Sequence, residues 1–176
     1  TPEGTLFPYT TLFRSYEIKE LVIASDITTI GSYQFYNFDT ITSIVVPENV
    51  TSFGEYVFYG CTNVTNITLP FVGKSATSTG SYGRLGYIFG TDSSGYINYY
   101  VPTKLTTVTI TGSTSIGASA FYGCKYLKKV IIPYSVTTIG GSAFYGCSAL
   151  TIYSCIDSKP TGWNSNWKSS NRPVVW

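Results

Sequence analysis

Apolar and polar positions recur along this chain with a fixed period of about 23 residues, within the range of roughly 20 to 50 that is typical of repeat proteins whose units stack in one direction. The segment Ile116–Cys124, Ile-Gly-Ala-Ser-Ala-Phe-Tyr-Gly-Cys, returns at Ile139–Cys147 as Ile-Gly-Gly-Ser-Ala-Phe-Tyr-Gly-Cys. The same spacing separates equivalent residues earlier in the chain, such as Phe35 and Phe58. The pattern therefore predicts a repeat solenoid.

Each repeat is expected to contain three elements. The string Leu-x-x-Val-x-Ile-Pro, as at 127–133, predicts a short strand whose Val and Ile face the core. Its proline ends the strand because it cannot donate a further ladder bond. Val-Thr-Thr-Ile-Gly at 136–140 predicts a second, shorter extended piece, with a glycine that permits the next turn. Ala-Phe-Tyr-Gly-Cys is too short for a stable α-helix, so we expect a single helical or 3₁₀ turn and a mostly β fold of parallel strands.

The repeat positions also define the expected core. Three of the four cysteines close the same motif, and no Cys-x-x-Cys pair accompanies them, so we interpret these three as buried thiols rather than as disulfide partners or metal ligands. The structural core is expected to contain Ile30, Phe35, Phe53, Phe58, Cys61, Ile116, Phe121, Cys124, Ile139, Phe144 and Cys147.

Three segments depart from the repeat. Thr5–Ser15 resembles the in-frame translation of a common DNA-sequencing adapter along its whole length, so residues 1–15 are interpreted as non-native. Residues 71–102 are rich in Gly, Ser and Tyr and are expected to form a long excursion from one coil. Residues 156–176 hold all three tryptophans and are expected to cap the open end of the solenoid, which would then span residues 16–155.

Composition favours an extracellular protein without bound nucleic acid. Charged residues make up only 11 % of the 176, about half the usual share, and Tyr, Thr and Ser take their place on the surface. The net charge is +2, and the only basic cluster is Lys125, Lys128 and Lys129, which argues against a phosphate-tracking surface. No apolar run reaches the roughly 18 to 20 residues of a membrane span, so we expect no membrane insertion by this segment, and we expect a monomer.

The candidate chemistry is sparse. The chain has no His, so neither a Ser-His-Asp nor a Cys-His arrangement can be built, and we expect no enzyme, no metal site and no cofactor. Glu48 and Glu55 could form a glycosidase pair, but they occupy variable repeat positions and are interpreted as solvated loop residues. Asp92–Gly95 is far too short for an EF-hand calcium loop and is interpreted as a polar turn.

The string Ile-Gly-x-x-Ala-Phe-Tyr-Gly-Cys-x-x-Leu-x-x-Val-x-Ile is complete at Ile116–Ile132 and nearly so at Phe53–Leu69. It resembles the BspA-like leucine-rich repeat family of bacterial and protist surface proteins, as do the Gly86–Gly90 segment and the Lys159–Trp163 tail. The resemblance implies a right-handed solenoid with parallel strands along one face. It also implies export to the cell surface and adhesion to host matrix proteins or other cells. The expected partners are therefore host matrix or cell-surface proteins, with glycans as a further candidate. The first repeat departs from the pattern, with Asn37-Phe38 in place of Gly-Cys.

Two surfaces are predicted to bind a partner. On the strand face, the outward positions expected to make contact are Asn66, Thr68, Thr107, Thr109, Lys129 and Ile131. In the excursion, tyrosines among Ser and Gly supply contact area at low entropic cost, and those expected to bind are Tyr82, Tyr87, Tyr96, Tyr99 and Tyr100. An alternative is that some of these rings only pack the excursion onto the solenoid. The function expected from the sequence is adhesion, and the alternative is a structural spacer that projects other domains.

Overall fold

A computed structural model describes residues 18–90, 100–168 and 172–176. The adapter-like segment 1–15 lies outside the described residues, as do Tyr96, Tyr99 and the Asp92–Gly95 turn.

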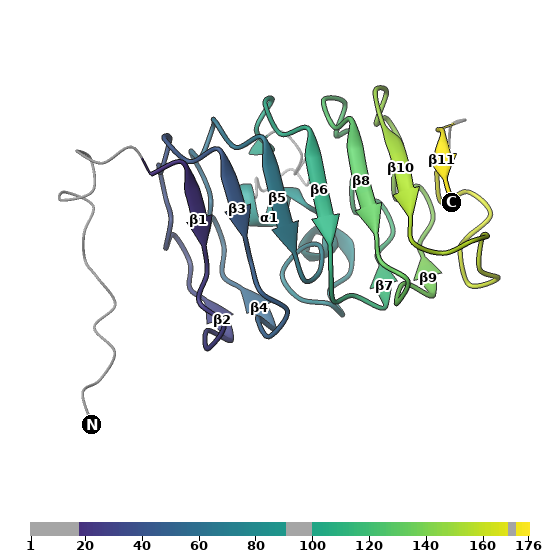
Figure 1. Ribbon diagram of the computed structural model, residues 1–176, viewed down its shortest axis with the longest axis horizontal. Coiled ribbons are helices and arrows are strands. Elements are labelled where there is room, and N and C mark those ends of the chain that lie inside the picture. Colours follow the sequence, from purple (N-terminus) through teal and green to yellow (C-terminus); the bar gives the residue numbers. More distant parts are fainter. Residues whose placement is uncertain (1–17, 91–99, 169–171) are drawn as a thin grey trace.

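The protein is a parallel β-solenoid in which equivalent positions of successive coils are 23 residues apart. Ser43 accordingly pairs with Asn66, and Thr29 pairs with Ser52. One continuous sheet forms the front of the molecule in Figure 1. Its strands, in spatial order, are β1 (Glu20–Val22), β3 (Ser43–Val45), β5 (Asn66–Leu69), β6 (Thr107–Ile110), β8 (Lys129–Ile132), β10 (Thr151–Ser154) and β11 (Val174–Val175).

Alternation along these strands separates core from surface. In β6 and β8 the burial pattern alternates residue by residue, so Val108 and Val130 point inward while Thr107 and Lys129 point outward. Parallel, in-register pairing then places equivalent side chains of successive coils beside one another. The fold therefore converts the sequence period into rows of side chains that run across the sheet.

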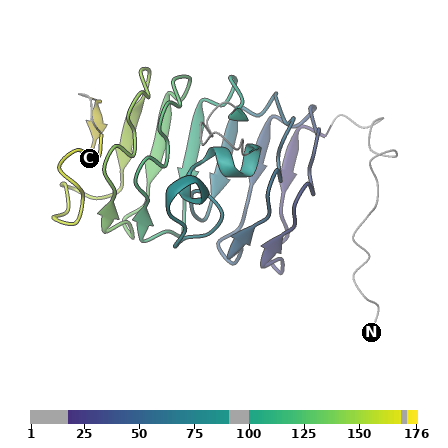
Figure 2. The ribbon, with the colours of Figure 1, turned by 180° about the vertical axis from the view of Figure 1, so that it is seen from behind.

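A second set of shorter strands forms two separate sheets behind the first. These are β2 (Thr29–Ile30) with β4 (Ser52–Phe53), and β7 (Ser115–Ile116) with β9 (Thr138–Ile139). Seen from behind, the excursion lies between the two pairs (Figure 2). It contains the 3₁₀ turn at Gly80–Gly83 and the short helix α1 at Gly86–Phe89.

The excursion takes the place of the back half of a coil. On the front, β5 pairs directly with β6, although the excursion lies between them in sequence. Thr65 and Thr106, which precede the two strands and are hydrogen-bonded to each other, are therefore 41 residues apart. On the back, the Phe58 N–H donates to the Ile88 carbonyl at 2.8 Å, and the Leu85 N–H donates to the Ala120 carbonyl at 2.9 Å. The strand face is thus continuous, while the excursion fills the gap on the opposite side.

The segments that contain Ala-Phe-Tyr-Gly-Cys differ from the helical or 3₁₀ turn expected from the sequence. Residues 118–123 form successive turns instead. Ser119 has φ 58° and Gly123 has φ 75°, and a left-handed residue interrupts a right-handed helix. Other coils repeat the arrangement; the left-handed residues equivalent to Ser119 are Tyr33, Tyr56 and Ser142, and those equivalent to Gly123 are Asn37, Gly60 and Gly146.

In this conformation the backbone N–H groups of the turn donate alternately within their own coil and to the next coil. The Ala120 N–H donates within its own coil to Gly117, whereas the Phe121 N–H donates to Ala143 in the next coil at 2.8 Å. The remaining bonds of the same two kinds are Tyr122 to Ser119, Ser119 to Gly141 and Gly123 to Tyr145. A helix would direct all these donors within one coil, so the left-handed residues gain hydrogen bonds between coils.

The repeat positions fill the interior as a single core. Of the side chains expected there, all except Phe35 have at most 6 % of their surface exposed. Phe35 is half-buried and stacks on Phe58 with ring centroids 5.7 Å apart. It lies in the first described coil and is therefore covered from one side by the next coil only.

The described part of residues 156–176 lies against the last coil. Trp163 and Trp167 are 2 % and 3 % exposed, and the Trp167 ring meets the Phe144 ring edge-on at 5.7 Å. The Trp163 Nε1–H donates to the Val136 carbonyl at 3.2 Å. Between Trp167 and Trp176, the chain adds β11 to the front sheet, a strand that the sequence pattern did not indicate.

Candidate binding surfaces

The strands of the front sheet, shown in Figure 1, carry two parallel rows of outward side chains that run from coil to coil. The polar row consists of Glu20, Ser43, Asn66, Thr107, Lys129 and Thr151. The apolar and β-branched row consists of Val22, Val45, Thr68, Thr109, Ile131, Tyr153 and Val175. All of the strand-face residues predicted to bind a partner belong to these rows, half of them to each.

The two rows are in contact near the C-terminal end of the sheet. The Lys129 Nζ lies 4.7 Å from the centroid of the Tyr153 ring, which is 37 % exposed. A cation over an aromatic face contributes about 0.5 to 1 kcal/mol at an exposed site. The contact holds the lysine over the apolar row, so that charge and apolar surface are presented together.

The excursion tyrosines that the structure describes do not form one surface. Tyr87 is 1 % exposed, and burial raises the pKa of its hydroxyl, so its prediction as a contact residue is corrected: the ring belongs to the core. Tyr82 packs edge-on against it at 5.7 Å and is 50 % exposed. Tyr100 lies elsewhere, with its ring 5.4 Å from that of Tyr59. Packing of the excursion therefore accounts for Tyr87, while Tyr82 and Tyr100 remain accessible.

Sequence reasoning missed stacks of tyrosines on the back of the solenoid. Tyr36 stacks on Tyr59 at 5.2 Å, and Tyr122 stacks on Tyr145 at 5.1 Å. The signal was present in the sequence, because the members of each pair are separated by one repeat period and each ring follows a repeat phenylalanine. These rings cover one another's faces and present mainly their edges to solvent.

The thiols of the three repeat cysteines have low reactivity. The Cys61 Sγ–H donates to the Phe35 carbonyl at 3.2 Å, and the Cys147 Sγ–H donates to the Phe121 carbonyl at 3.0 Å. Burial raises the pKa of both thiols to about 12, and it raises the pKa of Cys124 well above its ordinary value. A thiol that stays protonated is a poor nucleophile and metal ligand. All four cysteines are free, and only Cys155 is exposed.

The structure assembles no metal centre from the residues it describes. Across 18–90, 100–168 and 172–176, no three His, Cys, Asp or Glu side chains gather in a way that could hold an ion. Glu48 follows β3 on the front side, whereas Glu55 follows β4 on the back. Within the same described segments, no helix has the length and apolar character needed to cross a membrane.

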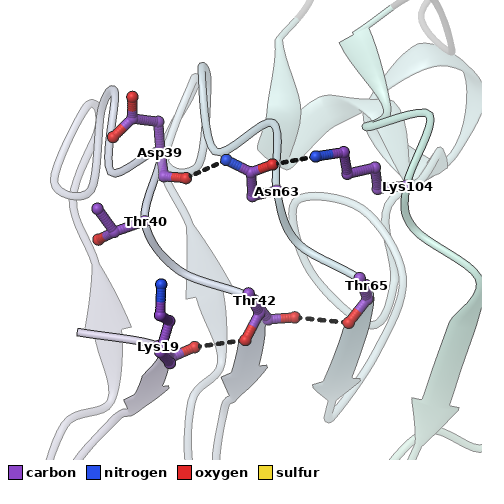
Figure 3. Close-up of a pocket in the computed structure, with 7 residues that line it drawn as sticks. All are labelled: Lys19, Asp39, Thr40, Thr42, Asn63, Thr65 and Lys104. Atoms are coloured by element: carbon purple, nitrogen blue, oxygen red, sulfur yellow. Dashed lines mark hydrogen bonds between the residues drawn. The ribbon is translucent and has the colours of Figure 1, made fainter. Parts of the chain in front are cut away.

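A groove lined by polar residue types lies along the edge of the solenoid that leads into the front strands (Figure 3). Its volume is about 440 Å³, and it is lined by Lys19, Asp39, Thr40, Thr42, Asn63, Thr65 and Lys104. The sequence did not indicate this site, because its lining comes from several separate coils.

Hydrogen bonds between coils fix the groove lining. The Thr42 hydroxyl donates to the Lys19 carbonyl at 3.0 Å, and the Thr65 hydroxyl donates to the Thr42 carbonyl at 3.0 Å (Figure 3). Asn63 donates its Nδ2–H to the Asp39 carbonyl at 2.6 Å and accepts a bond from the Lys104 ammonium through Oδ1. The lining is therefore ordered and offers hydroxyl, amide and ammonium groups.

Comparison with known proteins places this fold among repeat proteins. A family model described as "BspA type Leucine rich repeat region" matches residues 9–82 and 95–164, in six copies. A search of curated proteins gives no significant match.

Several solved bacterial structures are similar to this chain. A leucine rich cell surface protein from Faecalibacterium prausnitzii is 23 % identical with a TM-score of 0.52, over 87 % of this chain and 36 % of that one. A leucine-rich repeat protein from Treponema pallidum is 19 % identical with a TM-score of 0.40, over 78 % of this chain and 59 % of that one. One from Bacteroides ovatus is 23 % identical with a TM-score of 0.39, over 76 % and 39 %. The chain thus spans only about a third of the length of the first of these structures, and the likeness shows the fold.

Proposed function

Because this chain belongs to the BspA type leucine-rich repeat family, we propose that it is a non-enzymatic, surface-exposed module whose strand face binds proteins or cells. The observation that carries the proposal is the continuity of the two rows across the front sheet. Repeat proteins use such extended surfaces for binding because each coil adds one more side chain to each row.

The composition of the face supports binding rather than a purely structural role. The polar row changes from Ser43 through Asn66 and Thr107 to Lys129, although the buried positions of the same strands vary only among aliphatic residues. A spacer makes no demand on individual outward residues. A face with one apolar row and one polar row resembles the mixture found at protein interfaces.

The proposed location is the outer surface of a cell. The neighbour from Faecalibacterium is named a cell surface protein, and the low charge and high Tyr and Thr content of this chain suit an extracellular environment. The buried thiols also suit it, because their raised pKa protects them from oxidation. Matrix proteins and cell-surface proteins are the proposed partners, bound by a monomer.

A binding screen tests the proposal directly. The whole chain is applied to immobilised matrix proteins and to whole cells, together with the variant Thr109→Glu/Ile131→Glu, which places two charges in the apolar row. The matched control is Tyr134→Glu, since Tyr134 is 81 % exposed and lies after β8, away from that row. We expect saturable binding that the double variant loses and the control retains.

The excursion and the spacer are distinguished in the same screen. Loss of binding in Tyr82→Ser/Tyr100→Ser, with normal binding by the strand-face variant, would move the site to the excursion. A folded chain that binds no member of the panel would favour the spacer, whose repeats only project another domain.

A further inference from the structure

The two long edges of the solenoid carry opposite charge. One edge leads into the front strands and comprises residue 19 and the segments 38–42, 61–65, 102–106, 124–128, 147–150 and 172. The other edge leaves the strands and comprises the segments 24–28, 47–51, 70–74, 111–114, 133–137 and 155–160. The leading edge holds Asp39 and the cations Lys19, Lys104, Lys125, Lys128 and Arg172. The other holds Asp26, Glu48 and Asp157 with two cations, Lys74 and Lys159.

The leading edge is the edge that leads into the front strands. Its cations are far apart in sequence but lie side by side along this one border of the sheet. Lys19 precedes β1, Lys104 precedes β6, and Lys125 and Lys128 precede β8. Between β1 and β8 lie four strand spacings, about 19 Å at the usual distance between paired strands. All four lysines are exposed. A chain with a net charge of only +2 thus concentrates its positive charge on one border.

The groove of Figure 3 occupies the first part of this border. Lys19 lines it in the coil of β1 and Lys104 in the coil of β6, with Thr42 and Thr65 in the coils between. Its volume of about 440 Å³ lies within the usual range of small-molecule sites, roughly 300 to 1,000 Å³.

The groove lining carries two lysines and one carboxylate, Asp39, so its charge favours an anionic ligand. The hydroxyls of Thr42 and Thr65 each donate a proton to a backbone carbonyl, so their oxygens are left to accept hydrogen bonds from a ligand. The lysines at the two ends supply only donors and positive charge. A matching ligand therefore combines hydroxyl donors along its length with negative groups spaced several ångströms apart.

From this combination we infer that the leading edge binds an acidic saccharide, a chain of sugar rings that bear carboxylates or sulfates. Single-stranded nucleic acid fits less well, because none of the residues lining the groove is aromatic and bases bind such proteins mainly by stacking. A small inorganic anion fits less well too, because the cations are spread over several coils rather than convergent. The site is distinct from the strand face, and each can be tested without the other.

Calorimetry on the whole chain tests this inference with four probes. These are a sulfated heparin hexasaccharide, an oligogalacturonate of equal length, a neutral dextran oligosaccharide and a single-stranded DNA oligonucleotide, each in about 50 and 200 mM salt. We expect saturable, salt-sensitive binding of one or both acidic saccharides and none of dextran. The first two probes distinguish sulfate from carboxylate as the recognised group.

Two variants assign the binding to the groove. Lys19→Gln/Lys104→Gln removes the cations at its two ends, and we expect the affinity to fall about tenfold or more. Lys159→Gln removes one cation from the opposite edge and should change the affinity less than twofold. Both changes are at exposed side chains, and an unchanged melting temperature verifies folding.

Three results would overturn the inference. The first is the absence of saturable binding to either acidic saccharide. The second is an equal loss of affinity in Lys159→Gln, which would mean that net charge alone is responsible. The third is DNA binding as tight as saccharide binding and equally dependent on the two groove lysines, which would make the edge a general polyanion surface.

Discussion

The rings of Phe121 and Phe144 lie parallel in the core, with centroids 5.0 Å apart and planes at 8°. They occupy the same position of successive coils, and neither exposes any measurable surface. Identical residues at a fixed period thus pack on one another, which is how a repeated sequence builds a continuous interior.

Removing one of these rings should destabilise the protein strongly. We expect Phe144→Ala to lower the free energy of unfolding by about 3 to 5 kcal/mol, because it leaves a cavity between Phe121 and Trp167. Urea unfolding followed by circular dichroism measures the change. The control is Tyr145→Ala in the neighbouring stack, which is 47 % exposed and should cost about 1 kcal/mol. An unchanged midpoint in Phe144→Ala would contradict the central place of the ring.

Two glycines with the same conformation should respond differently to substitution. Gly123 and Gly146 have φ of 75° and 76°. A Cβ on Gly123 meets no atom within 4 Å, so Gly123→Ala should cost only the left-handed strain of about 1 to 2 kcal/mol. A Cβ on Gly146 lies 3.2 Å from the Gly123 Cα, so Gly146→Ala should cost more. Thermal unfolding gives the order, and equal losses would contradict the close approach of the two coils.

A third variant separates strain from packing. Asn37 occupies the equivalent turn position with φ 60°, and Asn tolerates this region better than Ala. We therefore expect Gly123→Asn to be less destabilising than Gly123→Ala. The reverse order would show that the cost of substitution at this position does not come from conformational strain.

The sequence predicted the front sheet and the core because both follow from local alternation and a fixed period. Ile67 and Val130 are buried, and Thr68 and Ile131 face outward, as the pattern Val-x-Ile requires. It did not predict the left-handed conformation of Ser119 and its equivalents, because the residue types at these positions, Ser and Tyr, do not indicate a positive φ. That conformation results from hydrogen bonding between coils.

The groove could not be predicted from the sequence either, for a different reason. Lys104 reaches Asn63, 41 residues earlier, only because the excursion is skipped on the front, where β5 pairs directly with β6. A constant period applied along the chain would not place these residues together. The burial of Tyr87 depends in the same way on how the excursion folds onto the coils.

Thiol reactivity should distinguish one cysteine from the others. Cys155 is exposed, whereas Cys61, Cys124 and Cys147 are buried. We expect one thiol per chain to react with a disulfide reagent under native conditions in mildly alkaline buffer, and all four in denaturant. Cys155→Ser serves as the control and should show no fast reaction. Fast reaction of a second thiol would contradict the tight packing of the repeat cysteines.

The tryptophan segment should stabilise the last coil. The Trp163 Nε1–H donates to the Val136 carbonyl, so Trp163→Phe leaves a buried acceptor without its partner. We expect a loss of about 1 to 3 kcal/mol in the free energy of unfolding. Trp176→Phe is the matched control, since Trp176 is 44 % exposed, and it should have little effect. Equal effects of the two variants would argue against residues 156–176 as a cap held by Trp163.

The buried thiols should make the protein less stable in alkali. Desolvation raises the pKa of Cys61 and Cys147 from an ordinary 9.0 to about 12, so between these values the folded thiols keep protons that the unfolded chain releases. Their contribution to stability is complete below about pH 9 and declines as the pH rises towards 12, by at most about 1.4 kcal/mol per pH unit for each thiol. Urea unfolding of the protein and of Cys147→Ala at a series of pH values isolates this part, because alanine does not titrate. We expect a shallower decline in the variant above the ordinary thiol pKa of 9.0, and parallel curves would show that the Cys147 thiol titrates alike in the folded and unfolded chains.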